Sequence, residues 1–255
     1  MIPRAETAAI LSGLPGVTHA FFGRRGGVST GPFASLNCSF SQGDAPKSVA
    51  DNRATILAAI GVASLAIARQ MHSSEAIAVS APFPEDRRPP VDGLVAATPG
   101  LALGILTADC VPILLADPRA KVIGACHAGW RGAVGGFVGA TIAAMLDLGA
   151  EPARIRAAIG PAISAANYEV GPDWAGALLA RDPANARYLS TPAGGREHFD
   201  LPRFVLDLLE GEGIVAPELV GGCTYASPDR YFSHRLATHR GTGCGRQLAV
   251  IALLP

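Results

Sequence analysis

The sequence predicts an α+β fold: mixed β-sheets flanked by helices, in a single domain that covers residues 1–255. The chain has 49% hydrophobic residues over 255 positions, which is enough for one sizeable core. Short apolar runs of strand length fill the middle of the chain. Helical stretches are interleaved with these runs without strict alternation, and this order favours mixed sheets with helices packed outside.

The N-terminal part is predicted to contain strands, tight turns and one helix. Segment 17–40 is punctuated by glycine and is typical of strands joined by tight turns. Residues 48–60 are expected to form a helix that Ser48 caps and that ends at Gly61. The proline-rich segment 82–90 is expected to be a loop.

The middle of the chain is predicted to supply most of the strands. Six apolar runs there are bounded by Pro, Gly or Asp and have the length of strands. The stretch D-P-R-A-K (117–121) is typical of a turn between two of them. The six expected strands cover 65–71, 76–80, 93–98, 101–107, 111–116 and 121–126.

Helices predominate in the predicted C-terminal part, and a strand ends the chain. Gly149 follows an apolar stretch and is a typical terminator of the helix before it. The expected elements, in chain order, are the helix 132–148, the strand 155–159, the helices 172–181 and 202–210, and the strand 246–253.

Composition excludes several classes of protein. The formal net charge is zero, so no overall field favours nucleic acid or an anionic membrane. Five cysteines are an odd number and too few for a disulfide scaffold in a chain of this length. The start lacks the pattern of a signal peptide, and no apolar run reaches about 18 residues without a charge. We therefore expect a reduced, cytoplasmic protein.

His72, Cys110 and His127 each lie at the end of a short apolar run. Neighbouring side chains on a strand point to opposite faces, so the three can converge while their neighbours enter the core. Two imidazoles and one thiolate suit zinc, with water as the fourth ligand. The same donors occur in blue-copper sites with a weak axial methionine. The pattern predicts an open metal site, with zinc preferred and copper as the alternative.

The segment H-A-G-W-R-G (127–132) joins a predicted strand to a predicted helix. Gly129 and Gly132 permit a tight turn, and the first N–H groups of the helix attract anions. Arg131 would add a planar fork for phosphate or carboxylate. The alternative is an ordinary turn with a surface arginine, and the nearby His127 favours the functional interpretation.

Three carboxylates are candidates for proton transfer. Asp109 lies between apolar runs, where burial raises the pKa of an unpaired carboxyl group. It could equally hold a loop by accepting backbone hydrogen bonds, and for Asp92 that structural role is the preferred interpretation. Glu75 could act beside His72 or could be a solvated loop residue.

Several segments spread over nearly the whole chain are similar to the family named for a multicopper polyphenol oxidase (laccase) domain. This family is also called the purine nucleoside phosphorylase and peptidoglycan editing factor family. T-A-D-C and H-A-G-W-R-G, in this order, are the most specific motifs. The matching segments are 21–29, 35–37, 43–53, 70–72, 91–95, 106–117, 127–132, 159–163 and 168–171.

This resemblance implies that His72, Cys110 and His127 are the metal ligands. It also implies a cytoplasmic protein that is often monomeric, with mixed sheets flanked by helices. The implied activities are phosphorolysis of adenosine, inosine and methylthioadenosine, deamination of adenosine, and editing of a peptidoglycan precursor. The residues expected to bind substrate or phosphate are Arg24, Asn37, Arg131 and Arg235.

The leading hypothesis is a zinc-assisted purine nucleoside phosphorylase. Phosphate would bind near Arg131 and Arg24, and Asp109 would donate a proton to the leaving purine. A multicopper oxidase is rejected, because only six histidines are present and three of them lack motif support. The rivals are a hydrolase with Cys110 as nucleophile and His127 as base, and a non-enzymatic metal or redox sensor.

Overall fold

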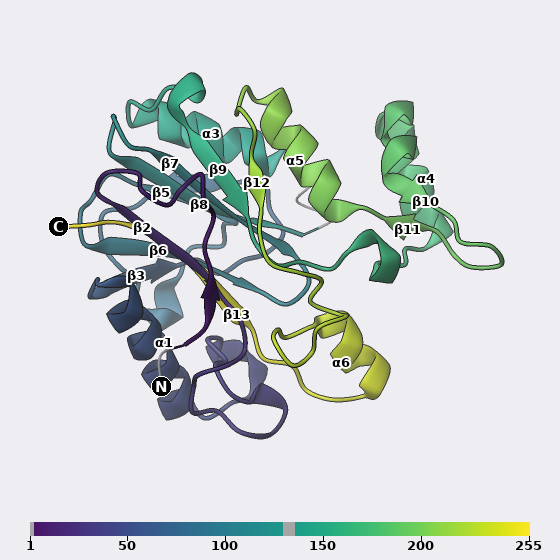
Figure 1. Cartoon of the computed structure of the whole chain (residues 1–255), viewed down its shortest axis with the longest axis horizontal. Coiled ribbons are helices and arrows are strands. Elements are labelled where there is room, and N and C mark those ends of the chain that lie inside the picture. Colours follow the sequence, from purple (N-terminus) through teal and green to yellow (C-terminus); the bar gives the residue numbers. More distant parts are fainter. Residues whose placement is uncertain (1–2, 130–135) are drawn as a thin grey trace.

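The computed structural model describes residues 3–129 and 136–255, and within them two mixed β-sheets form the centre of the molecule (Figure 1). In the first sheet β3 runs parallel to β6, while β6 and β2 run antiparallel to β13. Its strands, in spatial order, are β1 (Ala5–Glu6), β2 (Val17–Phe22), β13 (Gln247–Leu253), β6 (Leu101–Thr107) and β3 (Ser64–Ile67).

The second sheet is also mixed and carries the antiparallel β7–β8 pair at its centre. A separate small antiparallel pair joins β10 (Leu189–Ser190) to β11 (His198–Phe199). The strands of the second sheet, in spatial order, are β12 (Glu218–Leu219), β9 (Arg156–Ile159), β7 (Val111–Asp117), β8 (Val122–Ala128), β5 (Gly93–Ala96) and β4 (Ala76–Ala78).

Five α-helices are described, and most of them lie outside the two sheets. Short 3₁₀ helices occupy several connections, among them Phe40–Gln42 beside the site described below. None of the described helices combines the length and the apolar composition needed to cross a membrane. The α-helices are α1 (Pro46–Ile60), α3 (Phe137–Asp147), α4 (Pro172–Arg181), α5 (Leu201–Gly211) and α6 (His234–Arg240).

Three apolar clusters define the layers. One lies between the two sheets, where side chains of β6 and β13 meet those of β7 and β8. A second joins the outer face of β7, β8 and β9 to α3 and α5, and a third joins β2, β6 and β13 to α1. The order of layers is therefore helix, sheet, sheet, helix, as α1 and α3 on opposite sides of the sheets show in Figure 1. Burial on both faces explains the continuous apolar runs.

The expected fold class is confirmed: mixed sheets flanked by helices form one compact unit. The expected cap at Ser48 is wrong, because the helix begins at Pro46 with Ala45 in the cap position. Proline has a fixed φ and no N–H, so it suits the first turn of a helix. The helix expected over 132–148 is described from Phe137, and its first residues lie outside the described ranges.

Three expected strands end earlier than predicted, and one helix was not predicted. β3 ends at Ile67, β4 at Ala78 and β5 at Ala96, whereas the predicted strands continue to 71, 80 and 98. The chain leaves the first sheet after Ile67 and carries Gln70 toward β6 instead. The helix α6 was missed because its sequence, H-R-L-A-T-H-R, is polar and too short to show an apolar period.

Candidate metal centre

The structure brings His72, Cys110 and His127 together from three separate segments. His127 lies near the end of β8, Cys110 directly precedes β7, and His72 lies in the connection between β3 and β4. One ligand atom of each lies within 4.8 Å of the others. The Cys110 Sγ is 3.8 Å from Nε2 of His72, and the two imidazole centroids are 4.9 Å apart. No other group of this kind occurs among the described residues.

The backbone around His72 is fixed by the side chains of Asp92 and Gln70. His72 has a φ of 60°, in the left-handed region that residues other than glycine seldom adopt. Asp92 accepts hydrogen bonds from the N–H groups of Met71, at 2.9 Å, and Ser73, at 2.7 Å. Gln70 exchanges two 2.8 Å hydrogen bonds with the backbone of Leu106 in β6. These bonds flank His72 and hold its strained backbone conformation in place.

Gly129 provides the space that the His72 imidazole occupies. A β-carbon at this position would overlap Cδ2 and Nε2 of His72. Gly129 is not among the described glycines with positive φ, so the structure requires its small size and not an unusual backbone angle. The sequence predicted a tight turn at Gly129; the observed reason for glycine is the close approach of a second ligand.

Asp92 orients His127 as well as the His72 loop. Its Oδ1 accepts a 2.8 Å hydrogen bond from Nδ1 of His127, and the Asp92 side chain is fully buried. Burial raises the pKa of this carboxyl group, but the bonds from His127 and from the backbone outweigh it and lower the pKa to about 2. An ionised carboxylate only accepts, so the proton of His127 stays on Nδ1. The Nε2 lone pair is left for a metal.

The electrostatics of the cluster favour a thiolate. Burial raises the pKa of the Cys110 thiol, but the neighbouring imidazoles of His127 and His72 more than compensate and lower it to about 6. Burial lowers the pKa of His127, while Cys110 and Asp92 together raise it to about 9. Without a metal the cluster therefore holds a thiolate beside an imidazolium, and a bound cation would replace the extra proton.

The three side chains line a pocket of about 430 Å³. Arg69, Arg88 and Arg246 also line it, and no Asp or Glu side chain does so among the described residues. Arg88 is paired with Glu85 at 2.8 Å, whereas Arg246 is anchored through Nη1 to the carbonyl oxygens of residues 244 and 245. His234, the first residue of α6, completes this wall. The pocket is therefore positively charged beside the candidate ligands.

Asp109 lies next to Cys110 but its side chain does not line this pocket. Its Oδ1 accepts a 2.6 Å bond from the Thr224 hydroxyl, and its Oδ2 accepts a 2.6 Å bond from the backbone N–H of Arg235. These bonds hold the turn before β7, where Asp109 has a φ of 91°. The structure thus favours the loop-holding role over the donor role that the sequence also allowed.

Arg24, Asn37 and Arg235 also lie away from the lining of the metal pocket. Asn37 is fully buried and bonds the backbone of Ser39 and Arg246, both of which line the pocket. The guanidinium of Arg235 donates to the carbonyl of Glu169 in a separate small depression. Arg24 lines a different pocket, described below.

Two further expectations have different outcomes. Arg131, expected to bind phosphate, lies outside the described residues, so its role stays a prediction. Glu75 has an exposed side chain, and its backbone carbonyl accepts from the N–H groups of Asp92 and Gly93. Sequence reasoning missed the bond from His127 to Asp92, because 35 positions separate the two and no spacing rule joins them. It also missed Arg69 and His234, which no motif marks as pocket residues.

Comparison with known proteins places the chain in a family. The model of the family described as "Multi-copper polyphenol oxidoreductase laccase" matches residues 18–254. A purine nucleoside phosphorylase of Deinococcus radiodurans is 44% identical over 241 residues, covering 93% of this chain and 89% of the relative. One of Streptomyces coelicolor is 40% identical over 222 residues, covering 86% and 90%.

Solved structures give the same result. The crystal structure of a Neisseria meningitidis protein is 31% identical and superposes with a TM-score of 0.86 over 100% of both chains. That of YlmD from Geobacillus stearothermophilus is 29% identical, with a TM-score of 0.85 over 100% of this chain and 99% of the other. Cys110 of T-A-D-C and His127 of H-A-G-W-R-G line one pocket, and the chain belongs to the multi-copper polyphenol oxidoreductase laccase family.

Proposed function

We propose that the chain is a zinc-dependent purine nucleoside phosphorylase that acts on adenosine, inosine and methylthioadenosine. The observation that carries this proposal is the triad of His72, Cys110 and His127 in a positively charged pocket. The names of the curated relatives support it, since both relatives described above are called purine nucleoside phosphorylases. We further expect a cytoplasmic monomer that acts on small molecules, with no nucleic acid or membrane as partner.

The donor set fits zinc. Because Nδ1 of His127 bonds Asp92, Nε2 is the nitrogen that can bind a metal once the cation replaces its proton, and Cys110 is a thiolate at neutral pH. Three protein ligands of this kind leave one position for a reactant, which is the pattern of catalytic zinc. A bound zinc ion would act as a Lewis acid toward an oxygen of phosphate or water. Copper stays the alternative metal, because imidazole and thiolate also suit copper.

The arginines of the pocket are suited to hold the phosphate. Arg246 is fixed by its bonds to two carbonyl oxygens, and Arg69 has an exposed side chain with no ion pair among the described residues. Planar guanidinium groups bind phosphate in a bidentate manner. They would orient an attacking oxygen toward the sugar C1′ and stabilise its negative charge. Arg131 stays a further candidate for this role.

A hydrogen-bond donor to the leaving purine is also needed, because phosphorolysis leaves negative charge on the base. Among the described residues that line the pocket, His234 is the one titratable residue besides the triad and the arginines. Burial and the nearby Arg246 lower its pKa, so its imidazole is neutral at pH 7 and has one N–H to donate. With water in place of phosphate, the same pocket could deaminate adenosine.

The test is an elemental assay of the purified protein, followed by incubation with adenosine and with inosine, with and without phosphate. We expect about one zinc per chain. With phosphate present, the products should be adenine or hypoxanthine together with ribose 1-phosphate. Unchanged nucleosides in a fully metallated protein would contradict the proposal.

Two variants sharpen this test. Cys110→Ser should lose both the metal and the phosphorolysis, while Cys223→Ser, a change at another partly buried cysteine, should keep both. His234→Asn should keep the metal but lower kcat by about 10²-fold, in the range for loss of an acid–base group. Equal activity of Cys110→Ser and the wild type at low metal content would show that the triad is not catalytic.

A second candidate function is a cysteine hydrolase, for example one that edits a peptidoglycan precursor. It is favoured by one observation: Cys110, His127 and Asp92 form a thiolate–imidazolium–carboxylate chain of the kind used in nucleophilic catalysis. In that case the Cys110 thiolate would attack the carbonyl carbon of an amide or ester, the bond to the leaving amine or alcohol would break as His127 protonates it, and water would then hydrolyse the thioester. Mass spectrometry of metal-free protein treated with a small activated ester decides: an acyl group on Cys110 with turnover supports the hydrolase.

A further inference from the structure

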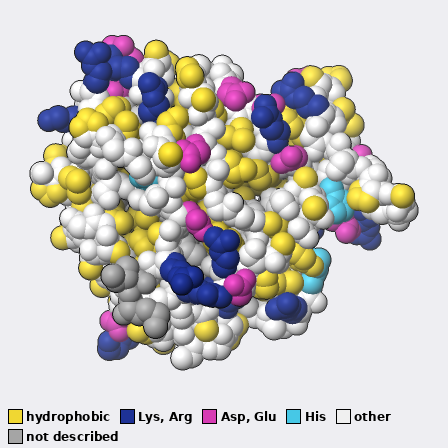
Figure 2. Space-filling view, in the orientation of Figure 1, with side chains coloured by type: hydrophobic (Ala, Val, Ile, Leu, Met, Phe, Trp, Pro, Cys, Tyr) yellow, Lys and Arg dark blue, Asp and Glu magenta, His cyan; other side chains and the backbone are white. Residues whose placement is uncertain are grey.

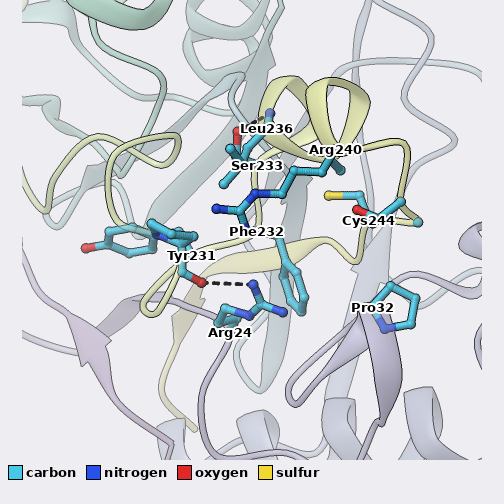
Figure 3. Close-up of a pocket in the computed structure, with 12 residues that line it drawn as sticks. Arg24, Pro32, Tyr231, Phe232, Ser233, Leu236, Arg240 and Cys244 are labelled. Carbon is cyan, nitrogen blue, oxygen red and sulfur yellow. Dashed lines mark hydrogen bonds between the residues drawn. The ribbon is translucent and has the colours of Figure 1, made fainter.

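A second pocket of about 500 Å³ lies beside α6, and no residue lines both this pocket and the metal pocket. Figure 3 shows that two guanidinium groups enter it from different segments: Arg24 from the chain after β2, and Arg240 from the last residue of α6. Phe232, Leu236 and Pro32 give the pocket an apolar wall. Its size is within the range of small-molecule sites.

Arg24 is held rigidly in this pocket. Its Nε donates to the carbonyl oxygen of Ala34 at 2.8 Å and its Nη1 to that of Pro228 at 2.9 Å. Its guanidinium carbon lies 4.6 Å from the centroid of the Phe232 ring. Nη2 has no hydrogen-bond partner among the described residues, so the group keeps free donors. A guanidinium fixed in this way loses little rotamer entropy when it binds a ligand.

In the described part of the chain, no ion pair balances the positive charge of the pocket. Neighbouring arginines are paired with acids: Arg25 with Asp229 at 2.7 Å, and Arg230 with Glu6. Arg24 and Arg240, by contrast, make no ion pair in the described ranges, and no Asp or Glu lines the pocket there. The residues outside these ranges contain no Asp or Glu in the sequence.

The two cations are close enough to affect each other. Burial lowers the pKa of Arg24 and Arg240 lowers it further, while Cys244 and Asp229 raise it. The Cys244 thiol beside them stays neutral, because burial raises its pKa. Asp229, the acid that acts on Arg24, is already paired with Arg25, so the two like charges at this cavity favour an anion between them.

We propose that this pocket binds a small organic phosphate whose phosphate group lies between Arg24 and Arg240 and whose flat apolar part packs on Leu236 and Pro32. A nucleoside monophosphate has this chemistry and is of suitable size. A sugar phosphate shares the anion but lacks the flat ring. The proposal does not depend on the reaction at the metal centre, because the two pockets have separate linings.

The test is isothermal titration of the metallated full chain with AMP, with ribose 5-phosphate and with inorganic phosphate. AMP should bind most tightly and inorganic phosphate at least tenfold more weakly. Arg240→Gln should weaken AMP binding at least tenfold without loss of folding, because this side chain is exposed. Arg119→Gln, which removes the same charge from the exposed turn between β7 and β8, is the matched control and should bind like the wild type.

Cys110→Ser separates the two pockets. It should lose phosphorolysis but keep the affinity for AMP, whereas loss of AMP binding in this variant would place the ligand at the metal centre and overturn the proposal. Unchanged binding by Arg240→Gln, or no binding by the wild type, would also overturn it. Equal affinities for AMP and ribose 5-phosphate would show that the apolar wall does not recognise a ring.

Discussion

Two buried aspartates lie near the opposite ends of β8, the strand that carries His127. Asp92, paired with His127 at one end, and Asp117, at the turn between β7 and β8, both have fully buried side chains. Asp117 accepts the backbone N–H groups of Arg119 at 2.9 Å, Ala120 at 3.1 Å and Glu151 at 3.0 Å. It also pairs with Arg154 at 3.1 Å. Each carboxylate therefore collects donors from more than one segment.

The two sites differ in what the carboxylate holds. Asp117 holds backbone N–H groups and a guanidinium that is always charged, so its role is structural only. Asp92 fixes backbone and an imidazole whose second nitrogen faces Cys110, so it sets the tautomer of a candidate metal ligand. The same burial thus gives a structural site at one end and a chemically active site at the other. Figure 2 shows that acidic and basic side chains are otherwise interspersed over the visible surface.

The largest effect on the free energy of unfolding is expected for Asp117→Asn. The amide places N–H atoms against the backbone donors and removes the charge that pairs with Arg154. We expect a loss of about 3 kcal/mol of stability, measured by urea unfolding at pH 6. Metal content and activity per folded molecule should not change. If the variant kept normal stability but lost its metal, the assignment of a purely structural role to Asp117 would be contradicted.

This loss should depend on pH. Burial raises the pKa of Asp117, but bonds from the backbone and from Arg154 dominate and hold it below the usual range. A depressed folded-state pKa contributes stability above the unfolded pKa, about 3.9, and this contribution disappears as pH falls through the folded value. The difference in unfolding free energy between wild type and Asp117→Asn should therefore narrow from pH 6 toward pH 3. A constant difference would show that the charge is not responsible.

The next largest effect is expected for Asp92→Asn, the same change at the other end. The amide can donate to Nδ1 of His127, which moves the imidazole proton to Nε2 and blocks the lone pair needed for a metal. Loss of such an orienting partner lowers metal affinity by about 10–100-fold. Competition with a zinc chelator measures this change, and excess zinc should restore much of the activity. Unaltered affinity would show that another group sets the tautomer.

The fold was largely predictable from the sequence because a strand that is buried on both faces appears in the sequence as a continuous apolar run. The runs 101–107 and 111–116 are apolar throughout and became the central strands β6 and β7, with bounds that agree to within one residue. The C-terminal ends of strands β3 and β5 were not predictable in this way. After β3, the hydrogen bonds of Gln70 with the backbone of Leu106 hold the chain away from the sheet position that the sequence predicted.

The gathering of the triad was predictable from residue type, but its surroundings were not. Histidine and cysteine at the ends of apolar runs indicate ligands, whereas Asp92 looks like any loop aspartate until His127 is placed beside it. Asn37 and Asp109 show the opposite case: both lie in specific motifs, yet both mainly hold backbone around the pocket. The motifs therefore located the site in the sequence, and the structure was needed to show what each residue does there.

The smallest expected effect on the metal centre comes from Gly129→Ala, compared with Gly176→Ala. An added β-carbon at Gly129, which is buried, overlaps the imidazole of His72, so this imidazole must move. The backbone of His72 is held in place, but its side chain is exposed and can rotate, so we expect about a tenfold loss of metal affinity, equivalent to about 1.4 kcal/mol. Chelator competition and a thermal unfolding curve would measure affinity and stability in parallel.

Gly176→Ala is the matched control, because nothing lies within 4 Å of its added β-carbon in α4. Alanine in place of glycine inside a helix should stabilise the fold by about 0.5–1 kcal/mol and leave the metal affinity unchanged. Equal metal affinities in both variants would mean that the His72 imidazole does not need the space above Gly129. In that case His72 would bind the metal from another position, or not at all, and the site would depend on Cys110 and His127.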